Sequence, residues 1–276
     1  MRTIKKLLSF FWSLQTFRVR GNSKFKDLHK GQTCLIFGNG ASLKYYDFDA
    51  IPDDLIAITC SFSLVDKRLK KKNVKYNIFS EPYIFYPYVY NDYVDKVQKN
   101  PIRRIFRKLI AENKHINFLP SITNSLAYFS KPSNVHYWHH FGLKDFSSND
   151  LAGKFSTCST ALDNMIGLAR YLGFSKALLL GCDYMCNPKM EGHFYANKVP
   201  VFGKEDLESQ KRIRKSVGDL DVLVICSKDV SSREFPSVTF EEYFKALEVY
   251  QTNKEIIDED DLKLMQDIAD AKVIFI

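Results

Sequence analysis

The sequence lacks a long apolar run. In its first twenty residues, MRTIKKLLSFFWSLQTFRVR, the uninterrupted apolar stretch is only LLSFFW, whereas about 20 apolar residues are needed to span a bilayer. No small-residue cleavage site follows, so neither a transmembrane helix nor a secretory signal peptide is expected. The segment is instead basic and has apolar residues at helical spacing. This pattern fits an amphipathic helix that lies on a membrane surface or packs on the domain.

Metal-ligand patterns are also sparse. Cys182 and Cys186 have no second pair and no histidine at a spacing that completes a tetrahedral site. The histidines of VHYWHH, at 135–140, have no suitable carboxylate or cysteine, and DFD at 47–49 favours the start of a short helix. Four of the six cysteines lie in apolar or small-residue runs, where a free thiol packs as a small hydrophobe. We therefore expect a reduced, cytoplasmic protein without a metal or another cofactor.

Acidic residues are fewer than basic ones, and the formal net charge is +8. The basic excess is concentrated in residues 1–20 and in KRLKKK at 67–72. Such clusters favour an anionic partner, either a membrane surface, a polyanionic glycan or a nucleic acid, or they form a solvated basic face. With a further basic run at 103–110, the N-terminal segment favours an anionic membrane, and we do not expect a nucleic-acid partner.

The order of apolar runs predicts the fold. Short runs, most of them apolar on both faces, alternate with helical patterns, which indicates an α/β fold with a mostly parallel sheet and helices on both faces. The expected strands are 33–37, 55–60, 76–80, 115–120, 134–138, 176–181, 221–226 and 272–276. The expected helices are around 92–112, 159–172, 205–217, 239–249 and 258–270. We divide the chain into a basic N-terminal segment (1–30), a central domain (31–250) and a C-terminal helix and strand (251–276).

A glycine-rich turn follows the first strand. In an open parallel sheet the ligand binds beyond the carboxyl ends of the strands, and there the chain reads GNGASL at residues 38–43. Glycines allow a close approach to a phosphate or sugar, and Asn39 and Ser42 can donate hydrogen bonds. Leu43 stands where the dinucleotide fingerprint needs glycine, and no P-loop lysine follows. A purely structural turn also accounts for these residues.

A second group of polar residues follows the strand KALLLG. Gly181 leads into Asp183 and Tyr184 at the carboxyl end of that strand, and His193 and Tyr195 come next. Histidine is the commonest general base near neutral pH, so His193 is a candidate base, although a lone histidine also occurs for structural reasons.

Hydroxyl groups precede the helix expected at 159–172. Ser159 and Thr160 either cap its N-terminus or bind a nucleotide phosphate there. Ser61 and Glu81 follow the second and third strands, so they are expected at the same edge of the sheet.

Taken in order, these motifs resemble those of the bacterial sialyltransferases of glycosyltransferase family 42. They are still more similar to relatives described as 6-hydroxymethylpterin diphosphokinase-like or motility-accessory proteins. The resemblance covers roughly residues 30–245 and includes FPSVTF at 235–240. It implies a Rossmann-like, GT-A-like fold and a CMP-activated nonulosonic acid donor. It also implies metal-independent, inverting transfer to a glycan or lipid-linked hydroxyl.

The resemblance also implies roles for single residues. Asn39, Gly40 and Ser42 would hold the nucleotide phosphate region, Thr160 would lie near the phosphate and carboxylate, and Asp183 and Tyr184 would contact the nucleotide and the leaving phosphate. Sialyltransferases of this family have asparagines where this chain has Ser61 and Glu81, and their base is a more distal histidine, whereas none follows His193. The expected catalytic residues are therefore His193 and Asp183, and the expected substrate-binding residues are Gly38, Asn39, Gly40, Ser42, Ser61, Glu81, Ser159, Thr160, Gly181, Tyr184 and Tyr195.

Two other functions stay open at this point. One is a pterin diphosphokinase-like enzyme, which would need magnesium and basic phosphate clamps, and the other is a non-catalytic nucleotide- or sugar-binding protein. The main expectation is a bacterial-type glycosyltransferase of surface polysaccharide, lipopolysaccharide or lipid-linked glycan assembly. It would be cytoplasmic and peripheral on the inner face of the membrane, and a homo-oligomer is compatible with these observations.

Overall fold

The computed structural model describes residues 15–79, 81, 84–85, 96–127, 131–139, 149–155, 160–196 and 199–270. The amphipathic helix expected in residues 1–20 lies mostly outside these ranges, and so does the strand expected at 272–276. Residues of the described N-terminal part form two short 3-10 helices, η1 (Thr16–Arg18) and η2 (Arg20–Phe25). The division of the chain at residues 30 and 250 stays a prediction.

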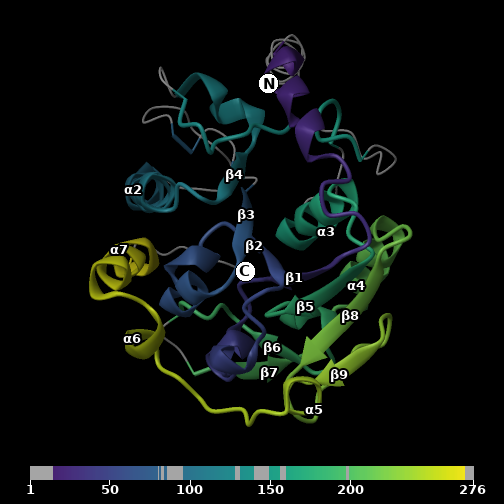
Figure 1. The fold of residues 1–276 in the computed structure, drawn as a ribbon. Helices are drawn as coiled ribbons and strands as arrows, with labels where there is room; N and C mark the ends of the chain where they lie inside the picture. The colour runs from purple at the N-terminus through teal and green to yellow at the C-terminus, as the bar shows by residue number, and fades with distance from the viewer. Residues whose placement is uncertain are drawn as a thin grey trace.

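A seven-stranded sheet forms the centre of the molecule (Figure 1). Its order is β4-β3-β2-β1-β5-β8-β9, and all neighbouring strands are parallel. The strands are β1 (Thr33–Phe37), β2 (Ile56–Cys60), β3 (Val74–Phe79), β4 (Asn117–Pro120), β5 (Lys176–Leu180), β8 (Asp221–Cys226) and β9 (Ser237–Thr239). The order reverses between β1 and β5, which is where open α/β sheets bind their ligands.

Both faces of the sheet are covered, as predicted. On β1, Leu35 and Phe37 belong to one hydrophobic core, and Cys34 and Ile36 belong to the other, because successive side chains of a strand point to opposite faces. The second core is closed by α3 (Ala161–Tyr171) and α4 (Leu207–Ser216), and the first by α2 (Lys96–Glu112) and the C-terminal helices. The α/β fold with a mostly parallel sheet is thereby confirmed.

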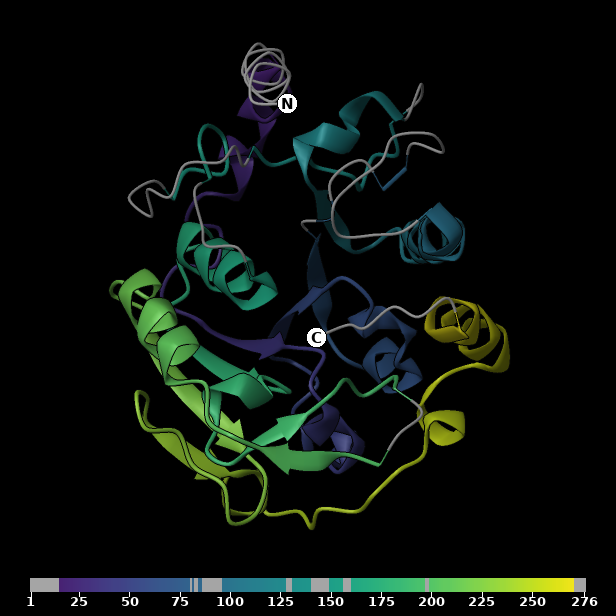
Figure 2. The same cartoon turned by 180° about the vertical axis from the view of Figure 1, so that it is seen from behind.

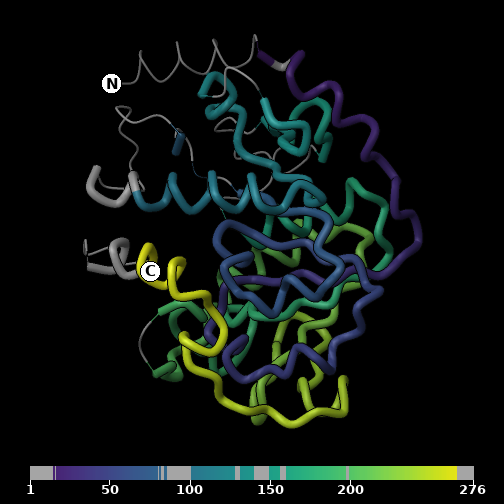
Figure 3. Tube along the Cα trace, turned by 60° about the vertical axis from the view of Figure 1, so that its left-hand side comes forward, coloured from purple at the N-terminus to yellow at the C-terminus, as the bar shows by residue number. Residues whose placement is uncertain are grey.

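Helices α2 and α7 (Glu259–Asp270) lie side by side on the first face (Figure 3). Lys108 Nζ of α2 is 2.6 Å from Asp261 Oδ1 of α7. The apolar residues of the basic run at 103–110, such as Ile105 and Phe106, are buried in the first core. These apolar side chains are therefore engaged in the fold and not available to a membrane.

Four residues of the basic run at 67–72 form ion pairs, and the side chains of two of them, Arg68 and Lys72, are largely buried. Arg68 in η6 (Lys67–Lys71) pairs with the buried carboxylate of Asp66 at 2.6 Å and lies over the Phe48 ring. The remaining ion pairs of this run are Lys70 with Asp258, Lys71 with Asp49, and Lys72 with Asp53. Arg68 and Lys72 therefore have a folding role, whereas Lys70 and Lys71 remain on the exposed surface.

Several elements differ from the prediction, and β9 and α6 (Asn253–Ile256) were not among the expected elements. Residues 134–138 contribute isolated bridges at Val135 and Trp138 instead of a strand. The helix expected at 239–249 is only α5 (Phe240–Phe244), because Lys245 adopts a left-handed φ of 58°. A two-stranded antiparallel hairpin, β6 (Lys189–Glu191) and β7 (Val201–Gly203), was not predicted, since three-residue strands are too short to show alternation.

Short helices fill the connections. They are η3 (Ala41–Lys44), η4 (Phe48–Ala50), η5 (Ser63–Val65), η7 (Ile122–Ala127), η8 (Asp183–Met185) and α6 (Asn253–Ile256). Within the described ranges, none of the helices is both long enough and apolar enough to cross a membrane.

Candidate active site

A cleft of about 730 Å³ opens at the carboxyl edge of the sheet, where β1 and β5 meet. Its walls are the turns after these two strands, the N-terminus of α3, strand β6 with the residues that follow it, and the start of α4. The predicted residues that line it are Gly38, Asn39, Gly40, Thr160, Gly181, Asp183, Tyr184 and His193. One predicted residue, Ser159, lies outside the described residues.

The glycine turn is explained by its contact with the turn after β5. The Gly40 N–H donates to Gly181 O at 2.8 Å. A Cβ atom on Gly38 would lie 2.2 Å from Gly181 O, and one on Gly40 would lie 2.5 Å from the same oxygen. Because Gly40 has an ordinary φ of −65°, close approach and not backbone conformation requires glycine there. The contact places Asn39 on the cleft wall.

Asp183, which follows β5, also joins the turns after β1 and β5. Its buried carboxylate accepts the Ser42 hydroxyl at 2.5 Å and the Ser42 N–H at 2.9 Å. Burial raises the pKa of Asp183 to about 6, and the hydrogen bonds from Ser42 and Ala41 act in the opposite direction. Ser42, which was expected to bind the nucleotide phosphate region, binds Asp183 and is not among the residues that line the cleft. A positioning role for Asp183 follows from this arrangement.

The raised pKa of Asp183 predicts a pH-dependent stability. Its folded pKa of about 6 lies above the value near 3.9 of an unfolded aspartate, so protonation favours the folded state. The stability from Asp183 is full below about pH 4 and is lost as the pH rises to about 6, by about 3 kcal/mol. We expect the unfolding free energy of the natural protein, relative to that of Asp183→Asn, to fall through this window in urea titrations. The exposed Asp54→Asn variant is the matched control, and a constant difference for Asp183→Asn would contradict the assignment.

His193 is held against the backbone of the glycine turn. Gly40 and His193 form an antiparallel bridge, and the Phe194 N–H donates to Asn39 O at 3.0 Å. His193 Nδ1 lies 3.2 Å from the same oxygen. A carbonyl oxygen only accepts, so we assign the proton to Nδ1, which makes Nε2 the acceptor of the ring. Burial lowers the pKa of His193, opposed by this hydrogen bond, so at neutral pH the ring is the neutral form that a general base requires.

Tyr195 supports the His193 ring. The two rings are stacked with centroids 5.0 Å apart and planes at 22°, and Phe62 packs edge-on against Tyr195 at 5.8 Å. Asn253 Nδ2 donates to Tyr195 O at 2.7 Å. Burial raises the pKa of Tyr195 well above its usual value, and nearby Cys60 and Glu81 add to the effect. Tyr195 therefore packs against His193 and is not among the residues that line the cleft, and its substrate contact stays a prediction.

The turns after β2 and β3 meet beside the cleft. Ser61 has a left-handed φ of 40°, and its hydroxyl donates to Glu81 Oε1 at 2.8 Å. Neither residue lines the cleft as described, although Cys60 does. Sequence reasoning missed Ser63, whose hydroxyl donates to Asn39 Oδ1 at 2.7 Å. The available signal was the Ser-Phe-Ser run directly after β2.

The N-terminus of α3 forms another wall of the cleft. The Thr160 hydroxyl accepts the Asp163 N–H at 3.3 Å and donates to Asp163 Oδ2 at 2.6 Å, so this hydroxyl caps the helix. Thr160, Ala161 and Leu162 line the cleft. The first N–H groups of a helix have no partner within it and carry partial positive charge. The Thr160 hydroxyl is thus engaged as the helix cap, and its predicted contact with the nucleotide phosphate stays a prediction.

Lys189, which sequence reasoning missed, is the only lysine or arginine among the described residues that line the cleft. Its Nζ lies 3.7 Å from Glu191 Oε1. Tyr184 stands on the same side, and burial raises the pKa of its phenol well above the usual value. Lys189 and the start of α3 are thus the positive features of an otherwise neutral to acidic cleft.

The chain is similar in structure to solved glycosyltransferases. A MAf glycosyltransferase from Magnetospirillum magneticum AMB-1 matches 93% of this chain at 13% identity and a TM-score of 0.46, and this chain spans 42% of that one. The sialyltransferase CstII from Campylobacter jejuni, in complex with cytidine-5'-monophosphate as a substrate analogue, matches 86% of this chain and 98% of its own length, at 17% identity and a TM-score of 0.44. CST-II with a trisaccharide acceptor and CMP matches 86% of this chain and 99% of its own, at 17% identity and a TM-score of 0.44. No protein-family model and no curated protein matches the chain.

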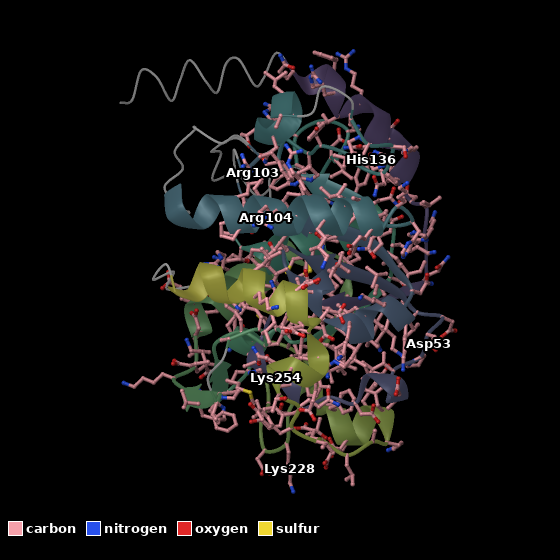
Figure 4. The ribbon with its side chains drawn as sticks, turned by 90° about the vertical axis from the view of Figure 1, so that its left-hand side faces the viewer. Asp53, Arg103, Arg104, His136, Lys228 and Lys254 are labelled. Carbon is pink, nitrogen blue, oxygen red and sulfur yellow. The ribbon has the colours of Figure 1, made fainter. Side chains whose placement is uncertain are left out.

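Residues of the sequence patterns that were considered as metal ligands form hydrogen bonds or close polar contacts within the protein. Asp47 caps η4 by accepting the Asp49 N–H. His136, which Figure 4 places in the upper half of the molecule, lies 3.1 Å from Asn117 Oδ1, and burial lowers its pKa to about 4. In the part of the chain that the structure describes, no three His, Cys, Asp or Glu side chains are grouped to hold a metal ion.

Proposed function

We propose that this protein is a glycosyltransferase that moves a sialic-acid-like nonulosonic sugar from a CMP-activated donor to a hydroxyl of a glycan or glycolipid. The observation that carries the proposal is that the neutral His193 lines the same cleft as the start of α3. One cleft thereby combines a general base with an anion-binding helix end. The order of the sequence motifs, which resembles that of glycosyltransferase family 42, supports the choice of donor.

The nucleotide side of the cleft suits a donor with a single phosphate. The start of α3 and Lys189 both line the cleft. The backbone N–H groups of the helix start and the lysine ammonium can therefore balance the phosphate charge without a divalent ion. Asn39 lines the cleft with its side-chain amide 2.7 Å from the Ser63 hydroxyl, and the other end of this amide can form a hydrogen bond with the nucleotide. We therefore propose a metal-independent reaction in which CMP is part of the substrate.

The proposed reaction is a single displacement. The acceptor oxygen attacks the anomeric carbon on the face opposite to CMP, and His193 Nε2 takes the hydroxyl proton. The bond between that carbon and the phosphate oxygen breaks, its electron pair leaves with CMP, and the configuration inverts. The start of α3 and Lys189 stabilise the departing phosphate, while Asp183 keeps the glycine turn in place through Ser42.

Calorimetric titration, together with an assay of CMP release from a CMP-linked donor, separates this proposal from the two other functions. The purified protein is titrated with CMP, with ATP in the presence of magnesium, and with a pterin. We expect binding of CMP and no binding of the pterin. A pterin diphosphokinase-like enzyme would bind ATP and the pterin, and a non-catalytic protein would bind CMP without releasing it from a CMP-linked donor.

A further inference from the structure

Large apolar side chains are exposed in two segments of the described chain. One segment is in and before β7, and the other is the connector at residues 245–252, between α5 and α6. We call the exposed residues of both segments the apolar surface: Val199, Val201, Phe202, Leu247, Val249 and Tyr250. Phe202 is 58% exposed and Leu247 is 74% exposed. Several large apolar side chains exposed close together commonly mark a site of interaction with a protein, a ligand or a membrane.

The two segments lie at the same end of the molecule, away from η1 and η2 (Figures 1 and 2). Residues 44–45 hold them there. The Val249 N–H donates to Tyr45 O at 2.8 Å, and the Tyr250 and Tyr45 rings pack at 5.3 Å. Lys44 Nζ donates to Ala196 O at 2.8 Å, just before the segment that enters β7. Both segments are therefore tied to the same short stretch after η3.

The apolar surface adjoins the cleft. Strand β7 pairs with β6 in the register Met190 with Phe202 and Glu191 with Val201, and both β6 residues line the cleft. Val201 and Phe202 are both more than half exposed, although Phe202 also borders a small cavity that Ser42 and Met190 line. A ligand on this surface would lie one strand away from the cleft wall.

The exposed charge of the two segments is positive. Residues 199–204 contain no acidic residue and end in the exposed Lys204. The connector contributes the exposed Lys245 and one acid, Glu248, whose carboxylate turns to the Lys228 N–H at 3.0 Å. Burial raises the pKa of Glu248 to about 7. Lys228 and Lys254 stand in the same lower half of the molecule in Figure 4, below Arg103 and Arg104 of α2.

We propose that the apolar surface binds the interface of an anionic lipid bilayer. Two attractions hold a peripheral protein on such a bilayer. Apolar side chains enter the headgroup region, and lysines beside them are attracted to the anionic lipids. A second copy of this chain fits less well, because an isologous contact would bring Lys204 and Lys245 toward their own copies. The inference does not depend on the proposed function, although it would place a lipid-linked acceptor near His193.

The experiment measures partition of the full chain onto sedimentable vesicles. Vesicles of phosphatidylcholine with one-third phosphatidylglycerol are compared with phosphatidylcholine alone. The Phe202→Asp and Leu247→Asp substitutions, combined in one variant, should lower the partition coefficient about a hundredfold, or about tenfold for each apolar side chain removed. Leu28→Asp, at a residue that is 54% exposed outside both segments, is the control and should bind as the natural protein does.

A second variant tests the lysines. Lys204→Gln combined with Lys245→Gln should weaken binding to the anionic vesicles about fivefold for each lysine, and should not change binding to phosphatidylcholine alone. Unchanged CMP affinity in all variants would show that the loss is specific to lipid and separate from the fate of the proposed function.

Three results would overturn the inference. The natural protein could fail to bind anionic vesicles, or the Phe202→Asp and Leu247→Asp variant could bind as well as the control, in which case other segments carry the binding. In the third, sedimentation velocity would show that the natural protein is an oligomer and that only the Phe202→Asp and Leu247→Asp variant is a monomer, while this variant still binds vesicles. The surface would then be a contact between copies of the chain.

Discussion

Replacing His193 with alanine is expected to lower turnover by about 10² to 10⁴-fold while CMP affinity stays near that of the natural protein. The reason is that Nε2 of the neutral ring would take a proton only as the acceptor oxygen attacks, so its loss affects the transition state and not nucleotide binding. The measurement is CMP release from a CMP-linked nonulosonic acid, beside CMP titration of the same preparation. His115→Ala, which removes an exposed histidine, is the control.

The pH profile gives this prediction a second readout. Because burial lowers the pKa of His193, the acidic limb of kcat/KM should lie below pH of about 6.5, the ordinary histidine value. Near-normal turnover in His193→Ala would exclude this histidine as the base. Lost CMP affinity in a folded variant would make it a binding residue instead.

Gly40→Ala should lower the unfolding free energy by about 2 to 4 kcal/mol, because overpacking against backbone cannot relax easily. The new Cβ would lie 2.5 Å from Gly181 O and 2.6 Å from Asp183 Oδ2, so the turns after β1 and β5 must separate. Denaturant titration measures the loss. Gly21→Ala is the matched control, since a Cβ on Gly21 meets nothing within 4 Å.

The same variant should also bind CMP more weakly, because Asn39 would move with its turn. If Gly40→Ala is as stable as Gly21→Ala, the close contact between the two turns does not hold in solution. Intact CMP affinity in a destabilised Gly40→Ala protein would move the nucleotide away from this turn.

The arrangement of the cleft was largely predictable from the sequence. Short apolar runs end at GNG and at Gly181, and the carboxyl ends of neighbouring parallel strands share one edge, so these turns had to be close if their strands were neighbours. The helix start at Thr160 was predictable too, because hydroxyl residues precede an apolar helical pattern.

The partners of individual side chains were not predictable. Ser42 binds a carboxylate 141 positions away, and no local pattern records such a contact. The lysines of the run at 67–72 likewise find their acids in other segments, among them Asp258. Local charge and spacing therefore suggested that these residues bind external ligands, whereas in the folded chain they contact residues from distant segments.

Titration with nucleotides tests the central claim most directly. The purified protein is titrated with CMP, UMP and AMP, each with and without EDTA, and the CMP titration is repeated with Asn39→Ala. A cleft built for a CMP-linked donor should bind CMP more tightly than UMP or AMP and bind it equally well in EDTA. Asn39→Ala should bind CMP about tenfold more weakly, as expected for one lost hydrogen bond. Equal affinity for the three nucleotides, or loss of CMP binding in EDTA, would contradict the proposed donor and its metal-independent binding.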